Sequence, residues 1–323
     1  MSGGRIAEMI CSRREMICGS GALMATSLLP AFAGDFGVFS KRGRYERMCI
    51  NVVTVDAGAT KPFSVLHISD THLTDAYPDE DEWKQQLKVR RTVTFGGFQE
   101  EALKESIAWA KSRCDYLVHT GDLIDWVSRK NLDLVKKYFG AKMFGSIGNH
   151  EESHYMGMDK KKGFNPSRSA TRAMLGKCYP FDISFSSQTI NGVNFICMDD
   201  VNGTVTREQV LKFKTEVERG YPIVLCMHVP FYTANIWRAT CKFWDYAKGP
   251  VSRDVPAPLH DYAVQCRDSV TREFIAYLKK EPLLKAILAG HEHIAVQERF
   301  SPTAVQYLVG GNYAFHGQEV IFL

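Results

Sequence analysis

The sequence lacks several features that would place it in other protein classes. Its nine cysteines include no C-x-x-C pair, which excludes a thiolate zinc site of the finger type. No stretch approaches about 18 consecutive apolar residues, so no transmembrane helix is predicted. Repeats and low-complexity tracts are absent, which argues against a solenoid and against a disordered chain.

A strong excess of charge is also missing. The net charge is +4 at pH 7, and the densest basic stretches, residues 41–47 and 160–162, are short. A dedicated nucleic-acid surface is therefore not predicted. The small positive excess suits a small anionic substrate, but an ordinary solvated surface explains it equally well.

The composition is that of one soluble catalytic domain with loop insertions, because the 323 residues are 45% hydrophobic and 24% charged. Cys114, Cys197 and Cys226 fall in or beside predicted strands, where a small buried side chain is expected. Cys11 and Cys18 lie in a segment that we expect to be removed. The remaining number of cysteines is odd, so a disulfide scaffold is not expected.

The amino-terminal segment resembles a twin-arginine export signal. Arg13 and Arg14 precede an apolar run at residues 17–29, and Ala31-Phe32-Ala33 supplies an A-x-A cleavage site. Residues 1–33 are therefore predicted to be the signal and residues 34–48 a linker. The protein would be exported to the periplasm or the extracellular space, with no stable membrane anchor after signal removal. The alternative is a frayed terminus with a chance arginine pair, and a start at Met16 would delete that pair.

Short apolar runs alternate with helical patterns over residues 49–323, which is α/β organisation in one domain. Two segments without a clear period, residues 153–178 and 232–265, are long enough to be lids. Thr206 is a predicted helix cap. Predicted strands are 49–55, 63–68, 116–119, 142–147, 193–198, 223–227, 284–288, 294–300, 304–309 and 320–323, and predicted helices are 98–112, 129–139, 207–218 and 269–279.

Residue types that bind metals follow five of these strands. The carboxyl ends of strands in α/β sheets are where sites are built, so we expect these side chains to converge. In chain order the candidate ligands are Asp70, His72, Asp122, Asn149, His228, His291 and His293.

The chemistry of this set fits two cations. An Asp can bridge two metal ions, while imidazole and amide ligands add no further negative charge that would repel an anionic substrate. Nitrogen and oxygen ligands without thiolate suit Mn, Fe or Zn. The glycines before Asp122, Asn149 and His291 are expected to allow sharp turns, and residues two apart, as in Asp70-x-His72, would face the same side of an extended backbone. A lone pair of this kind is more often a surface turn or a core histidine, so the ordered set carries the prediction.

In order, the motifs D-x-H, G-D, G-N-H-E, H and G-H-x-H resemble the pattern of the calcineurin-like metallophosphoesterase superfamily, from about residue 63 to about residue 296. The resemblance implies a four-layer sandwich of two mixed β-sheets flanked by helices. It also implies that Asp70, His72 and His293 bind one metal ion, that Asn149, His228 and His291 bind the other, and that Asp122 bridges them.

The activity implied by the resemblance is hydrolysis of a phosphomonoester or phosphodiester by attack of a metal-bridging hydroxide. His150 would be catalytic, stabilising the transition state or protonating the leaving oxygen. Asp125 could orient His150, or could equally be a solvent-facing carboxylate at a helix start. Purple acid phosphatases differ from this pattern, because they carry a tyrosine ligand after G-D where this chain has Asp125.

Other histidines and aromatic residues have less specific interpretations. His67 and His119 are predicted to be buried within strands, whereas loop histidines, residues 154, 260 and 316, are predicted to lie at the surface, with His154 the best substrate contact among them. Aromatic residues after His228 could wall a pocket, although core packing explains them comparably well; they are Phe231, Tyr232, Trp237 and Trp244.

Two alternative functions remain open on the sequence. One is a metal-dependent nuclease, which the weak basic charge disfavours. The other is a non-catalytic binding protein on the same fold, which the complete ligand set disfavours.

Overall fold

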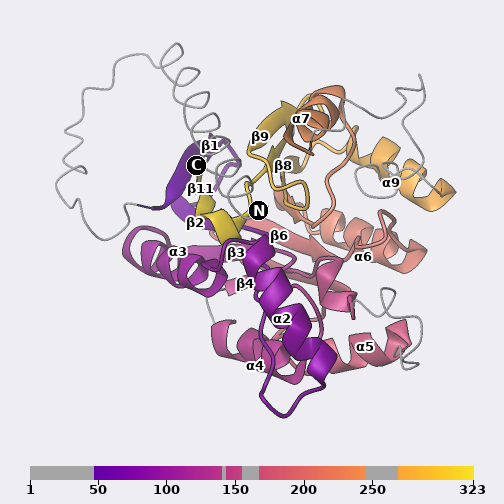
Figure 1. The fold of residues 1–323 in the computed structure, drawn as a ribbon. Helices are drawn as coiled ribbons and strands as arrows, with labels where there is room; N and C mark the ends of the chain where they lie inside the picture. The colour runs from indigo at the N-terminus through magenta and orange to yellow at the C-terminus, as the bar shows by residue number, and fades with distance from the viewer. Residues whose placement is uncertain (1–46, 140–142, 155–166, 245–267) are drawn as a thin grey trace. The chain divides into compact units, whose positions relative to one another are not determined.

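The computed structural model describes residues 47–139, 143–154, 167–244 and 268–323 (Figure 1). The chain divides into two units, Met1–Cys49 and Ile50–Leu323, and only residues 47–49 of the first are described. The predicted signal and most of the predicted linker lie outside the described residues. No helix in the described part is both long and apolar enough to cross a membrane.

The first sheet has five strands in the order β1-β11-β2-β3-β4. Its three parallel strands, β2 (Phe63–Ile68), β3 (Tyr116–Thr120) and β4 (Met143–Ser146), lie side by side, with β4 at one edge. The carboxyl-terminal strand β11 (His316–Phe322) runs antiparallel to β2 and separates it from β1 (Cys49–Val55). Three parallel strands therefore end at the same edge of this sheet.

The second sheet has six strands in the order β5-β6-β7-β8-β10-β9. Strands β6 (Val193–Met198), β7 (Ile223–Cys226), β8 (Leu284–Ala289) and β10 (Val305–Leu308) are parallel. The antiparallel strands β5 (Phe185–Ile190) and β9 (Val296–Arg299) close its two edges. The sheet is therefore mixed, like the first.

Three hydrophobic clusters bind these sheets and their helices into four layers. One lies between the sheets and includes Val65, Phe195 and Leu288. Another joins the first sheet to α3 (Gln99–Arg113), α4 (Arg129–Tyr138) and α5 (Arg168–Leu175). The third joins the second sheet to α6 (Arg207–Glu218), α7 (Ala234–Trp244) and α9 (Ser269–Leu278). The expected four-layer sandwich of two mixed sheets is confirmed.

Alternation along the strands explains this layering. In β2, Val65 faces the other sheet, whereas Leu66 and Ile68 face the helices, as expected for side chains that point to opposite faces in turn. Both faces are buried, so the strands read as nearly continuous apolar runs. This is why most strand bounds were predicted within one or two residues. The cap at Thr206 is also confirmed, as a capping box with Gln209.

Several elements were not predicted. Helix α2 (Glu82–Thr94) buries only Leu87, so it has almost no apolar stripe. Helices α5 and α7 lie within the segments 153–178 and 232–265, which the sequence left without periodicity; residues 155–166 and 245–265 of those segments lie outside the described residues. The edge strand β5 was missed because it is short and polar, and β11 begins earlier than the predicted 320–323.

Candidate metal centre

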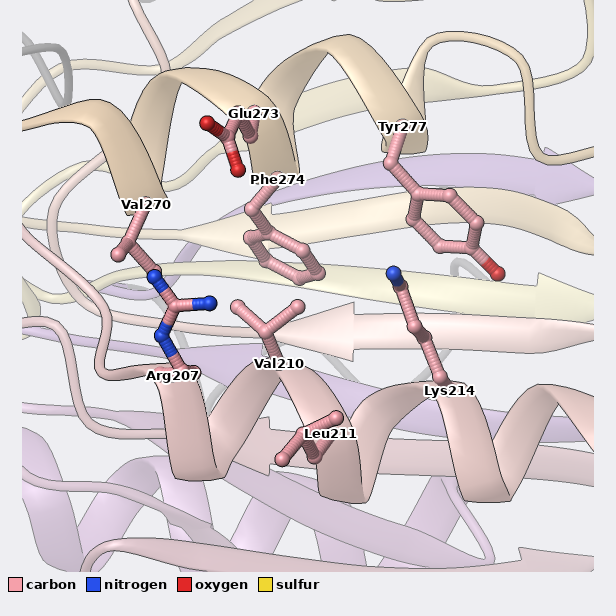
Figure 2. Close-up of a pocket in the computed structure, with 8 residues that line it drawn as sticks. All are labelled: Arg207, Val210, Leu211, Lys214, Val270, Glu273, Phe274 and Tyr277. Atoms are coloured by element: carbon pink, nitrogen blue, oxygen red, sulfur yellow. The ribbon is translucent and has the colours of Figure 1, made fainter.

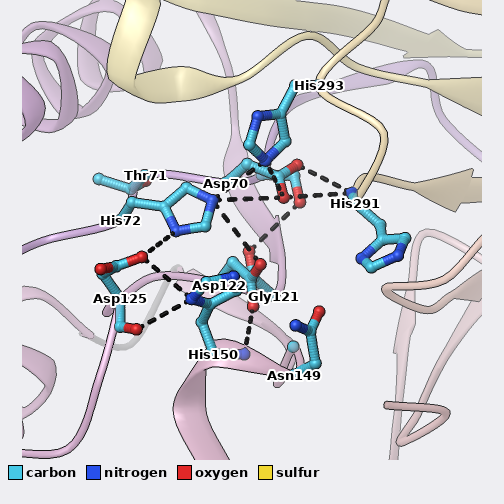
Figure 3. Close-up of polar contacts among 12 residues, drawn as sticks. Asp70, Thr71, His72, Gly121, Asp122, Asp125, Asn149, His150, His291 and His293 are labelled. Carbon is cyan, nitrogen blue, oxygen red and sulfur yellow. Dashed lines mark hydrogen bonds and ion pairs between the residues drawn. The ribbon is translucent and has the colours of Figure 1, made fainter. Parts of the chain in front are cut away.

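Loops at the carboxyl ends of β2, β3, β4, β7 and β8 bring all seven candidate ligands to one place. Figure 3 labels all of them except His228. The loops are joined to one another by backbone hydrogen bonds. Asp70 N donates to Gly121 O over 3.0 Å, His72 N donates to Asp122 O over 2.9 Å, and Gly290 N donates to His228 O over 3.1 Å. The convergence predicted from the strand ends is therefore present in the structure.

The first group consists of Asp70, His72 and His293. The Nε2 atoms of His72 and His293 lie 3.1 Å apart. Nε2 of His293 is 3.4 Å from Asp70 Oδ1, and Nε2 of His72 is 3.9 Å from the same oxygen. Three potential ligand atoms from three side chains therefore surround one point.

The second group consists of Asp122, Asn149, His228 and His291. Nε2 of His228 lies 3.1 Å from Asn149 Oδ1, 3.2 Å from His291 Nδ1 and 3.2 Å from Asp122 Oδ2. The same Asp122 Oδ2 is 3.7 Å from His72 Nε2. Asp122 thus lies between the two groups, where a bridging carboxylate is expected.

The backbone at five of the seven candidates is left-handed. The φ angles are positive at Asp70, His72, Asp122, His291 and His293, from 52° to 69°. Such values are uncommon for residues other than glycine, and they cluster where a site requires them. The expectation that D-x-H and H-x-H are extended is therefore wrong, although the side chains in each pair do share one site.

The glycines before the candidate ligands serve mainly to allow close approach. A Cβ on Gly148 would lie 2.2 Å from Asp122 Oδ1, and a Cβ on Gly290 would lie 1.9 Å from Ser69 Oγ. Of these three glycines, only Gly121, with φ of 96°, also has a left-handed backbone.

The histidine rings are oriented so that cations could bind between their nitrogen atoms. His228 Nδ1 lies 2.8 Å from Thr120 O and His72 Nδ1 lies 3.0 Å from Asp125 Oδ1, so each Nδ1–H donates outward. Each Nε2 is then left to point a lone pair into the cluster, toward a second imidazole nitrogen. Facing lone pairs repel unless positive charge lies between them, and such outward hydrogen bonds are usual for histidines that bind metals.

Buried carboxylates supply the matching negative charge. Asp70 and Asp122 are buried; burial alone would raise their pKa values, but the neighbouring histidines hold both pKa values below the usual range. Burial alone would lower the pKa of His228, but the charge and hydrogen bond of Asp122, together with the charges of Asp70 and Asp200, raise it to about 10. The cluster therefore attracts positive charge, as a proton or as a metal ion.

His150 lies beside the cluster with one nitrogen fixed by Asp125. Its Nδ1 is 3.0 Å from Asp125 Oδ1 and 2.9 Å from Asp125 O, and its side chain is 21% exposed. Burial lowers the pKa of His150, but the charges of Asp122 and Asp125 outweigh it and raise the pKa to about 9. Asp125 is fully buried and pairs with Arg91 of α2 through two contacts of 2.6 and 2.8 Å. The orienting role of Asp125 is supported, and a solvent-facing carboxylate is excluded.

Two carboxylates that the sequence analysis did not select hold the ligand loops. Glu151 accepts hydrogen bonds from the backbone N–H groups of Asp122, Leu123, Ile124 and Gly148. Asp200 accepts from the N–H groups of His228 and Val229. Glu151 is part of the G-N-H-E motif and so carried a sequence signal, whereas Asp200 carried none.

Of the remaining histidines, some lie where the sequence predicted and one does not. His67 and His119 are buried as predicted, with hydrogen bonds to Thr120 and Thr71. His154 bonds to Thr171 Oγ1. His316 is buried at the start of β11, so its predicted surface position is wrong. Residue 260 lies outside the described residues.

The aromatic residues after His228 separate in the structure. Phe231 is in the core and stacks on Phe300, whereas Tyr232 and Trp244 are exposed. Only Trp244 lies beside a candidate ligand, with its ring centroid 5.3 Å from that of His293.

A surface pocket of about 120 Å³ lies away from these groups, between α6 and α9 (Figure 2). It is lined by mixed residues such as Lys214, Phe274 and Tyr277, and none of the candidate ligands lines it. Its titratable lining residues are Arg207, Lys214, Glu273 and Tyr277, and none of them belongs to the groups of potential metal ligands found in the described residues.

Comparison with known proteins is consistent with this geometry. Residues 63–295 match the family model described as calcineurin-like phosphoesterase. This match covers well over half of the sequence, so the chain belongs to the calcineurin-like phosphoesterase family. No curated protein sequence is similar enough to count as a match.

Solved structures include distant relatives. A dimetal phosphatase of Danio rerio is 12% identical, with a TM-score of 0.44, and the alignment covers 78% of this chain and 88% of that one. The phosphopantetheinyl hydrolase of Mycobacterium tuberculosis is 16% identical, with a TM-score of 0.39, covering 78% of this chain and 91% of the other.

Proposed function

We propose that this protein hydrolyses phosphoesters with two metal ions held by the seven clustered residues. Asp70, His72 and His293 would hold one ion, and Asn149, His228 and His291 the other. The observation that carries the proposal is the position of Asp122 Oδ2, which lies 3.2 Å from His228 Nε2 and 3.7 Å from His72 Nε2 and so joins the two groups.

The metal ions would contribute charge that lowers the pKa of a water and neutralises the phosphoryl oxygens. The chain itself contributes geometry and a proton. His150 keeps Nδ1 bonded to Asp125, which leaves Nε2 directed away from that bond and able to give a proton to a leaving oxygen. The raised pKa of His150 favours its protonated form at neutral pH. Arg91 and the Asp125 carboxylate fix the orientation of this ring.

The family motifs are common to phosphatases and phosphodiesterases, so the substrate panel has to include both. Metal-reconstituted protein should hydrolyse p-nitrophenyl phosphate or bis-p-nitrophenyl phosphate with added Mn²⁺, and elemental analysis should find about two metal ions per chain. Fe and Zn should be compared with Mn in the same assay. Absence of turnover together with absence of bound metal would refute the proposed phosphoesterase activity and favour the alternative of a non-catalytic binding protein.

Export is a separate proposal, supported by Arg13, Arg14 and the A-x-A sequence at residues 31–33, all outside the described residues. Amino-terminal sequencing of exported material should begin near Gly34. Recovery of the intact Met1 terminus from the cytoplasm alone would contradict it. Replacing both arginines by lysine is the matched control, since it keeps the charge and removes the recognised pair.

A further inference from the structure

Aromatic rings line the side of the centre formed by His72 and His293. Phe95 stacks on His72 with ring centroids 4.2 Å apart and an interplanar angle of 10°. The ring of Tyr313 lies 4.8 Å from that of Phe95 and 5.3 Å from that of His293, and the ring of Trp244 also lies 5.3 Å from that of His293. We call Phe95, Tyr313 and Trp244 the aromatic rim.

The aromatic rim runs from the interior to the surface. Phe95 is buried, Tyr313 is half-buried, and Trp244 is 39% exposed. All five tryptophans lie in the described part of the chain, and Trp244 is the one among them that is exposed. An exposed indole next to a candidate metal ligand is therefore a distinctive feature of this surface.

Tyr313 is held in this position by the ligand loop itself. Its backbone N–H donates to Asp70 O over 3.2 Å, and the neighbouring Asn312 N donates to Ser69 O over 2.8 Å. Asn312 also accepts a hydrogen bond from Thr71. Hydrogen bonds between two segments that are distant in the sequence thus fix the backbone of Tyr313 relative to Asp70, so the tyrosine forms part of a preformed surface.

The arrangement has a direct chemical consequence. A phosphoryl group held between the two metal-binding groups would place its ester substituent beside neighbouring side chains, and on the His293 side those side chains are rings. Aromatic rings bind other flat rings by offset or edge-to-face contact, in addition to the burial of apolar area. Arg91, which lies 4.9 Å from the ring of Phe95, pairs with Asp125.

We propose that the aromatic rim is a subsite for a flat aromatic group carried on the phosphoester, with Trp244 and Tyr313 as its contact surfaces. This inference rests on the proposed function and narrows its substrate class to aryl-bearing or heteroaryl-bearing esters. Phe95 is a positioning residue, since it is buried behind His72.

The test compares benzyl phosphate with cyclohexylmethyl phosphate. The two esters share their charge, nearly share their size and leaving-group basicity, and differ in aromaticity. For metal-reconstituted wild-type protein we expect kcat/KM to favour benzyl phosphate by about 3- to 10-fold, the range that one ring contact supplies. In Trp244→Leu the ratio should fall toward one. Tyr313→Leu should lower it, and Tyr313→Phe should keep it.

Binding gives a second measurement that does not depend on turnover. Calorimetry with benzylphosphonate and cyclohexylmethylphosphonate should show the same preference and the same loss in Trp244→Leu. Tyr221→Leu is the matched control. Tyr221 is as exposed as Trp244, at 39%, but it precedes the amino end of β7, whereas His228 follows the carboxyl end. It should change neither the ratio nor the activity.

Each outcome separates the two proposals. Equal rates and equal affinities for the two members of each pair would overturn the subsite. A Trp244→Leu variant that slows both esters equally would also overturn it, because Trp244 would then only hold His293 in place. Preferential binding of benzylphosphonate without hydrolysis of any ester would retain the subsite and reject the phosphoesterase.

Discussion

The two candidate metal-binding groups are supported in different ways. The group of His228 and His291 is held by hydrogen bonds that His228 donates. Its Nδ1–H donates to Thr120 O, and its backbone N–H donates to Asp200 Oδ1. In the group of His72 and His293, Asp125 bonds to His72 and aromatic rings pack against both histidines. Asp122 and the glycine loops around it belong to both.

This difference suggests that the two groups have different roles. A group fixed by hydrogen bonds to buried backbone is expected to hold its metal ion rigidly. A group bordered by rings and by the partly exposed His150 has the surface that a substrate can reach. We therefore expect changes around His228 to affect metal affinity, and changes around His72 and His293 to affect turnover and substrate choice.

Asp122→Asn should have the largest effect, because it removes the charge common to both groups. We expect kcat to fall by at least about 10²- to 10³-fold, the range for losing one element of a preorganised polar site. Metal content should fall as well, while circular dichroism stays unchanged. Retained activity at normal metal content would refute the bridging position.

Asp200→Asn tests the hydrogen-bonded side. The variant keeps the shape but weakens the acceptor for the His228 and Val229 N–H groups, so affinity for one of the two metal ions should fall by about 10- to 100-fold. Titration calorimetry with Mn²⁺ measures this directly. Phe95→Leu on the other side should lower the same affinity less, and an equal loss in both variants would contradict this difference in roles.

Asp125→Asn tests the side that carries His150. Loss of the negative charge next to His150 lowers the pKa of that ring, so its acid form is lost at a lower pH as the pH rises. The alkaline limb of the kcat profile should therefore move to lower pH relative to wild type. Asp133→Asn is the control, since Asp133 is an exposed carboxylate on α4. An unchanged limb would remove His150 from the role of acid.

Gly148→Ala should distinguish the two groups least, because Gly148 lies against Asp122, which belongs to both groups. Its new methyl group would meet Asp122 Oδ1 at 2.2 Å, so the free energy of unfolding should fall by about 1–3 kcal/mol from overpacking. Gly176→Ala is the matched control, with its nearest contact at 3.4 Å. Chemical denaturation measures both, and equal stabilities would show that the loop relaxes freely.

Sequence reasoning brought together the candidate ligands because their signal is local. Each candidate directly follows an apolar run that forms a parallel strand, and parallel strands end at a common edge. The same locality explains the failures. Helix α2 has no apolar stripe to reveal it, and its Arg91 reaches Asp125 from 34 positions away.

The sequence by itself determined the order of the strands along the chain, the seven candidate ligands and His150, because strand periodicity and residue chemistry are written in neighbouring positions. Tertiary structure decided the left-handed backbone at five ligands, the anchoring by Glu151 and Asp200, and the aromatic rim. Those features depend on contacts between distant segments, such as His228 with Thr120, 108 positions apart, and His291 with Asp70, 221 positions apart. Their energies exist only once the sheets have packed, so no local pattern could encode them.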